Sequence, residues 1–125
     1  MIIEVSNGEL LDKVSILEIK LKLITNEAQL KNIQAEYDHL NAMAKILLVN
    51  EDAAEFYRQL TIVNERLWEI EDAIRLKEHN QQFDNEFIEL ARSVYFTNDN
   101  RSAIKKAINN CTGSTLVEEK SYQTY

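Results

Sequence analysis

The sequence comprises 125 residues, 45% of them apolar and 28% charged, a composition typical of one folded domain with its own core. The net charge of −7 and the lack of a dense Lys/Arg patch argue against nucleic acid as a partner, and no apolar run is long enough to cross a bilayer. The single cysteine cannot form an internal disulfide, and residues 1–4 do not resemble the start of a secretion signal. We therefore expect an acidic cytoplasmic protein.

Residues that break helices are almost missing from the chain. Proline is absent, and glycine occurs only at Gly8 and Gly113. Apolar residues recur at steps of three and four over most of the length, which is the period of an α-helix. The sequence therefore predicts a single all-α domain over residues 1–125, with capping residues between its helices.

Side chains that cap helices mark the amino ends of the first three predicted helices. Ser6 followed by Glu9 has the spacing of a capping box, and Asn26 followed by Gln29 repeats it. Asn50 precedes an acidic pair, which suits the positive end of a helix. These signals predict helices over Asn7–Ile24, Glu27–Leu48 and Glu51–His79.

The last third of the chain contains two further polar interruptions. Residues 80–84 form a polar break, and Thr97–Asn100 is dense in residues that cap helices. We expect two shorter helices, Asn85–Phe96 and Arg101–Asn110, the second closed by Gly113. The short β-prone runs Ile2–Val5 and Thr115–Val117 could pair as a small ribbon.

Two apolar stripes with alternating steps of three and four predict a long antiparallel hairpin of the second and third helices. The second helix contributes Leu30, Ile33, Tyr37, Leu40, Ala44 and Leu47, and the third contributes Phe56, Leu60, Val63, Leu67, Ile70 and Ile74.

The first helix is apolar on two opposed faces. One stripe consists of Leu10, Val14, Leu17, Leu21 and Ile24, and nearly opposite lie Ile16, Ile19 and Leu23. Such a helix must be covered on both sides. Either it lies at the centre of a layered monomer, or its second face meets another subunit. We favour the subunit interface and expect a homo-oligomer, most simply a two-fold dimer, through Ile16, Ile19 and Leu23.

Residues capable of chemistry form no complete catalytic or metal-binding set. Acidic pairs at helical spacing occur, but neither His39 nor His79 completes a di-iron or zinc signature. Cys111 has no partner cysteine or adjacent base and continues an apolar stripe, as a buried hydrophobe would. We expect no metal, no cofactor and no catalytic residue.

One polar strip is a candidate ligand site. Asn64, Trp68, Glu71 and Arg75 are stacked at helical spacing, away from the apolar stripe of the third helix. An aromatic platform beside an amide, a carboxylate and a guanidinium suits a sugar or another polar small molecule. The alternative is an ordinary packed tryptophan beside a surface ion pair. Residues that could supply an opposite wall are Arg92, Tyr95, Asn98 and Arg101.

Several blocks of the sequence resemble an uncharacterised family of small bacterial and phage proteins, described only as a domain of unknown function. They are Val5–Lys13, Ile16–Lys20, Asn64–Asp72, Phe87–Tyr95 with Thr97–Asp99, and Leu116–Tyr122. Phe96 departs from the family, whose members often carry His before the Thr-Asn-Asp run. The resemblance implies no assigned reaction; members are sometimes found beside glycosyltransferases of surface polysaccharide assembly.

Two functions fit these observations. The first is a non-enzymatic assembly or adaptor protein, in which helical surfaces build an oligomer that holds other proteins. The second is a binder of a sugar or nucleotide sugar, or an enzyme acting on one, with its pocket around Trp68. The first is favoured because no catalytic constellation is complete.

Overall fold

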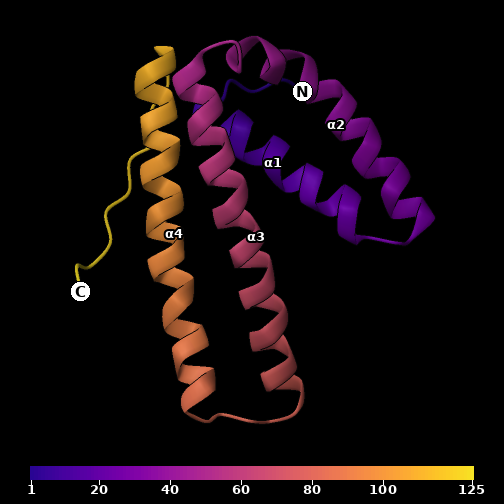
Figure 1. Cartoon of the computed structure of the whole chain (residues 1–125), viewed down its shortest axis with the longest axis vertical. Helices are drawn as coiled ribbons and strands as arrows, with labels where there is room; N and C mark the ends of the chain where they lie inside the picture. The colour runs from indigo at the N-terminus through magenta and orange to yellow at the C-terminus, as the bar shows by residue number, and fades with distance from the viewer.

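The computed structural model describes residues 1–125 and consists of four α-helices without any β-strand. The first antiparallel pair is α1 (Asn7–Leu23) with α2 (Glu27–Leu47), and a second, longer pair is α3 (Glu51–His79) with α4 (Asn85–Thr112). The shorter pair leans out from one end of the longer one (Figure 1). The all-α prediction is confirmed, whereas the two termini form no ribbon. None of the helices combines the length and apolarity needed to span a membrane.

The predicted caps locate the helix starts. The side chains of Ser6, Asn26 and Asn50 each accept a hydrogen bond from the backbone N–H three residues later, at 3.0–3.1 Å. Gly113 ends α4 in the left-handed conformation with φ 64°. These local signals depend on residues adjacent in sequence, which is why they could be read without a structure.

The predicted hairpin of the second and third helices is wrong. α2 packs on α1 and α3 packs on α4, with little contact between α2 and α3. The apolar stripes themselves are covered, since Ile33 and Ala44 on α2 and Leu60 and Ile70 on α3 are buried. A stripe shows which face of a helix must be covered, but it does not identify the helix that covers it.

The two expected C-terminal helices are one continuous helix, α4. Thr97, expected at the boundary between them, is buried with 5% exposure in mid-helix. The residues Thr97–Asn100 favour caps only weakly over helix interiors, and packing along the whole of α3 outweighs that preference. The resulting 28-residue helix reaches from the loop after α3 to the start of α1.

The apolar core lies where the four helices meet. Its fully buried members are Leu11, Val14, Ala44, Leu60 and Ile108. Because α1 contacts α2 on one side and both α3 and α4 on the other, it lies at the centre of the protomer. Ile19, expected at a subunit interface, is covered within the chain at 2% exposure. Ile16 is half-buried, so Leu23, 54% exposed, is the main apolar surface left on the second face of α1.

Candidate functional site

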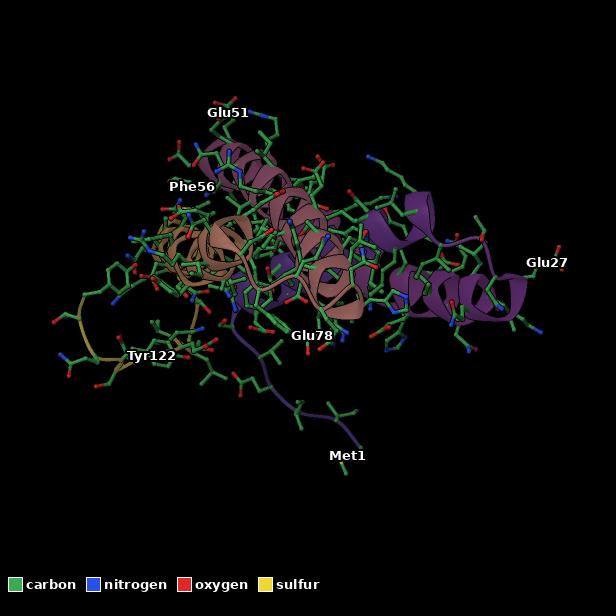
Figure 2. The ribbon with its side chains drawn as sticks, turned by 90° about the horizontal axis from the view of Figure 1, so that it is seen from below. Met1, Glu27, Glu51, Phe56, Glu78 and Tyr122 are labelled. Carbon is green, nitrogen blue, oxygen red and sulfur yellow. The ribbon has the colours of Figure 1, made fainter.

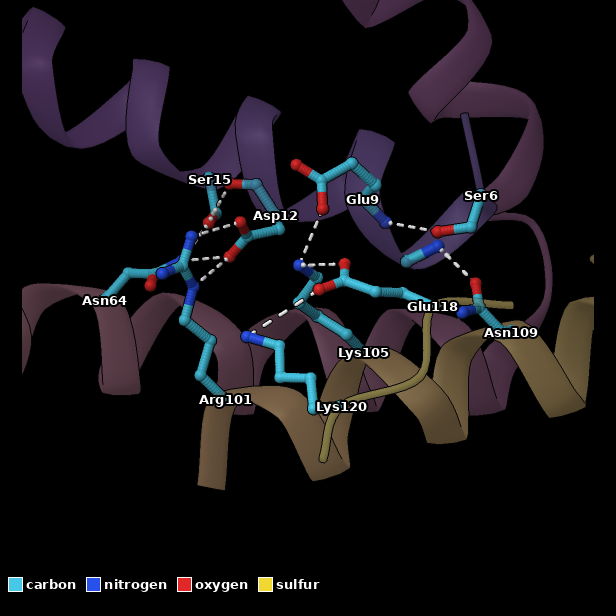
Figure 3. A network of polar contacts seen from close by, with 11 residues as sticks. Ser6, Glu9, Asp12, Ser15, Asn64, Arg101, Lys105, Asn109, Glu118 and Lys120 are labelled. Atoms are coloured by element: carbon cyan, nitrogen blue, oxygen red, sulfur yellow. Dashed lines mark hydrogen bonds and ion pairs between the residues drawn. The ribbon is translucent and has the colours of Figure 1, made fainter. Parts of the chain in front are cut away.

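Side chains near the end of α4 hold the amino end of α1 (Figure 3). The Gly8 backbone N–H donates to Asn109 Oδ1 at 2.7 Å, and the Asn7 N–H donates to Ser114 Oγ at 3.1 Å. The Glu9 N–H donates to Ser6. The first three amides of α1, which no helical carbonyl can satisfy, therefore all have partners.

Gly8 allows α1 and α4 to approach closely. A Cβ at this position would lie 2.4 Å from the Lys105 carbonyl oxygen and 3.0 Å from Asn109 Oδ1. Real Cβ atoms do not come within 3.0 Å of such a neighbour, and the oxygen belongs to helical backbone, which cannot swing aside. Glycine is required here for space rather than for its backbone freedom.

A charged network crosses the three-helix junction beside this contact. Asp12 has 1% exposure, and its carboxylate pairs with both Nε and Nη2 of Arg101, the Nε bond being 2.8 Å. Asn64 Nδ2 donates to Asp12 at 3.0 Å and to Ser15 Oγ at 2.7 Å. The hydrogen bonds that Arg101 donates to Asp12 raise the pKa of the guanidinium. Residues of α1, α3 and α4 are thus joined around one buried carboxylate.

Lys105 extends the network toward the C-terminal segment. Its ammonium lies 2.6 Å from a Glu9 carboxylate oxygen and 3.4 Å from one of Glu118. Burial lowers the pKa of Lys105, but the Glu9 hydrogen bond and the nearby carboxylates outweigh burial, so the pKa is raised. Glu9 therefore bonds Lys105 rather than completing the capping box.

Two tyrosines from α2 and α3 face one carboxylate of α1. The Tyr37 hydroxyl donates to Glu18 at 3.4 Å, and the Tyr57 hydroxyl is buried without a hydrogen-bond partner. Burial, followed by the nearby Glu18, raises the pKa of both tyrosines. Both hydroxyls therefore stay protonated at neutral pH: Tyr37 donates its proton to Glu18, and Tyr57 remains a donor without a partner.

The segment after Gly113 runs back along α4, and an open cavity of about 1030 Å³ lies between the two. The Tyr125 hydroxyl donates a hydrogen bond to Asp99. The centroid of the Tyr125 ring lies 4.8–5.3 Å from the ring centroids of Tyr95 and Phe96. One wall of the cavity belongs to α4 and the other to the C-terminal segment. The lining residues are Val94, Tyr95, Asn98, Asp99, Arg101 and Ser102 of α4, and Lys120, Tyr122, Gln123, Thr124 and Tyr125 of the C-terminal segment.

The predicted ligand residues of α3 occupy separate environments. Asn64 is buried in the Asp12 network. Glu71 and Arg75 form an exposed ion pair at 3.0 Å within the helix. Trp68 is half-buried, and it lines neither the cavity above nor a smaller one of about 200 Å³ beside Lys105.

The predicted residues of α4 are closer together. Tyr95, Asn98 and Arg101 all line the large cavity. Arg92 instead pairs with Glu89 at 3.3 Å and lies over the ring of Phe96. The C-terminal wall of the cavity, with its two tyrosines, was not anticipated, because nothing in the sequence shows that this segment folds back on α4.

No three His, Cys, Asp or Glu side chains gather where they could hold a metal ion. Cys111 is half-buried, and burial raises its pKa, so the thiol is not activated as a nucleophile. The charges of the Asp12 network are satisfied by one another. This arrangement stabilises the junction of α1, α3 and α4.

A model for a family of unknown function (DUF6165) matches residues 1–125. The chain belongs to the DUF6165 family. Neither a search of curated proteins nor a search of solved structures found a match.

Three of the blocks that carry the DUF6165 resemblance meet at the junction described above. Val5–Lys13 supplies Gly8, Glu9 and Asp12, Asn64–Asp72 supplies Asn64, and Leu116–Tyr122 supplies Glu118. Sequence reasoning missed Asp12 and Ser15. A signal was present, because Gly8, Asp12 and Ser15 follow one another at steps of four and three on the second face of α1.

Proposed function

We propose that this DUF6165 protein is a non-enzymatic assembly or adaptor protein of the cytoplasm that acts as a homo-oligomer, most simply a two-fold dimer. The proposal is supported by the large solvent-exposed surface area of the single protomer. The isolated protomer exposes 8698 Å², about a quarter more than the roughly 6,900 Å² expected of a compact monomer of its mass.

The excess arises from the shape of the protomer. The extended termini contribute part of it, and the two helical pairs diverge so that α2 is covered mainly by α1. The excess is about twice the ~800 Å² that each partner buries in a standard protein interface. Large apolar side chains on all four helices are at least half exposed, among them Leu23, Met43, Ile46, Ile62, Leu76 and Ile88.

The wild-type protein is expected to sediment as a dimer at micromolar concentration. Covering exposed apolar surface is favourable by about 25 cal/mol per Å². Analytical ultracentrifugation over a concentration series measures the mass directly. A monomer at every concentration up to about 100 µM, where interfaces of this size are normally occupied, would contradict the proposal.

A polar ligand in the cavity beside α4 is the second candidate function. Three of the predicted ligand residues line that cavity, together with Tyr122 and Tyr125. Asp99 and Lys120 carry opposite charges, and Arg101 is already paired with Asp12. The cavity wall is therefore nearly balanced in charge and rich in aromatic faces, which favours a neutral saccharide over a phosphate. The polysaccharide context implied by the family resemblance points to the same class.

A neutral disaccharide panel, tested by titration calorimetry, should include a binder whose affinity falls about tenfold in Tyr95→Ala, because loss of one stacked ring is worth up to ~1.5 kcal/mol. Phe83→Ala is the matched control, since Phe83 is an exposed aromatic residue outside this cavity. Equal affinities in the two variants would place the ligand elsewhere, and no binding to any member of the panel would remove this candidate.

A further inference from the structure

α2 is apolar on two opposed sides, and the protomer covers only one. The inner side carries the buried Ile33 and Ala44 with the half-buried Tyr37 and Leu40, three of which join the core with α1. At 100° per residue, the opposite side is centred on one exposed stripe. Its apolar members are Ala28, Ala35, Ala42 and Ile46, and Val49 follows just after the end of the helix.

The larger members of this stripe are among the most exposed apolar side chains of the helices. Ile46 is 66% exposed, Val49, just after α2, is 82% exposed, and Met43 at the edge of the stripe is 55% exposed. Glu27 marks the far end of the same helix in Figure 2, where α2 projects away from α3 and α4. The chain has no further helix to cover this side.

Charges along one flank of the stripe identify what would cover it. Glu27, Lys31, Asp38 and Lys45 are exposed, and all four lie within about 40° of one another around the helix. None of them takes part in an ion pair within the chain; Asp38 accepts one hydrogen bond, from Gln34. The signs alternate as minus, plus, minus, plus.

This order is complementary to itself when reversed. In an antiparallel two-fold pair of helices, the same flank of each adjoins the other and runs in the opposite direction. Glu27 then faces Lys45 of the second copy, and Lys31 faces Asp38. In a parallel two-fold pair, this flank would instead adjoin the opposite flank of the second copy, so the four charges would not meet one another and their order would find no complement.

We infer that the outer face of α2 binds α2 of a second copy in an antiparallel two-fold dimer, with Ala35 near the axis and Ala28 opposite Ala42 of the other copy. Alanine at these positions allows the helix axes to approach closely. Ile46 and Val49 then extend past the start of the second α2 and cover the adjoining turn. This inference rests on the homo-oligomer proposed above and names its surface.

Ala35→Glu tests the surface. It places two carboxylates near the axis, so the dimer dissociation constant should rise at least tenfold, since facing like charges cost about 1.4 kcal/mol or more. Glutamate is a good helix former, and Ala35 is exposed, so the separated protomer should keep its circular dichroism spectrum. Ala103→Glu, at an exposed alanine of α4, is the matched control and should leave the dissociation constant unchanged.

A charge exchange tests the direction and register. Lys31→Glu or Asp38→Lys alone should weaken the dimer about tenfold, because two like-charged contacts replace two attractive ones. The double variant should return to within about threefold of wild type. Residues 31 and 38 are seven apart on one helix, too far to pair with each other, so recovery reports contact between copies.

The outcomes separate the two proposals. A monomeric wild type would overturn both. A wild-type dimer that Ala35→Glu weakens no more than Ala103→Glu does would leave the oligomer standing and overturn the α2 surface. A dimer that Ala35→Glu disrupts, but that the double exchange fails to restore, would overturn the antiparallel pairing.

Discussion

Replacing Asp12 by alanine is expected to lower the free energy of unfolding by about 3 kcal/mol, and Tm by roughly 10 °C. The substitution leaves the Arg101 guanidinium in a largely buried site and removes an acceptor from Asn64. Breaking a buried ion pair costs about 3–5 kcal/mol, and we take the lower end because the Arg101 side chain is 29% exposed. Chemical denaturation at one fixed protein concentration measures the loss, since oligomer formation makes stability depend on concentration.

Glu71→Ala is the matched control. It breaks the ion pair with Arg75, in which the Glu71 and Arg75 side chains are both more than half exposed, and should cost less than about 0.5 kcal/mol. Asp12→Asn keeps the volume of the side chain, removes the negative charge and replaces one acceptor oxygen with an NH2 donor, so it tests the charge and its hydrogen bonds without creating a cavity. If Asp12→Ala and Glu71→Ala prove equally mild, the buried network does not hold the helices together.

Replacing Gly8 by alanine is expected to destabilise the protein by about 1–3 kcal/mol, although alanine is the better helix former by about 1 kcal/mol. The added methyl group would collide with the Lys105 carbonyl oxygen, so α1 and α4 must separate. Separation would also stretch the bond from the Gly8 N–H to Asn109. The sign of the effect is therefore opposite to that predicted from helix propensity alone. Thermal unfolding followed by circular dichroism measures it.

Gly113→Asn serves as the control at the other glycine. Gly113 has φ 64°, and a Cβ at this position would meet no atom within 4 Å, so only backbone conformation constrains it. Asparagine tolerates the left-handed region, and the loss should stay below about 1 kcal/mol. A Gly8→Ala protein as stable as wild type would show that the close contact between α1 and α4 is not required.

The candidate residues divide according to how far apart their partners lie in sequence. Ser6, Asn26 and Asn50 cap helices through amides three residues away, and sequence spacing predicted all three. Asp12 meets Arg101 across 89 residues and Asn64 across 52, and no local pattern pairs such positions. The residues of the predicted ligand strip all lie on α3, but helical spacing does not show where Arg92 or Tyr95 lies relative to Trp68.

Residue chemistry along the chain determined the helical class, the caps and the faces that require cover, because helix formation depends on contacts between residues three or four apart. The tertiary structure alone decided which helices pair, that Thr97–Asn100 lies inside α4, and that α1 is covered on both sides while α2 is not. The physical reason is that apolar burial is non-directional. A stripe gains the same free energy against any complementary surface, so the choice of partner depends on the lengths and connections of all four helices together.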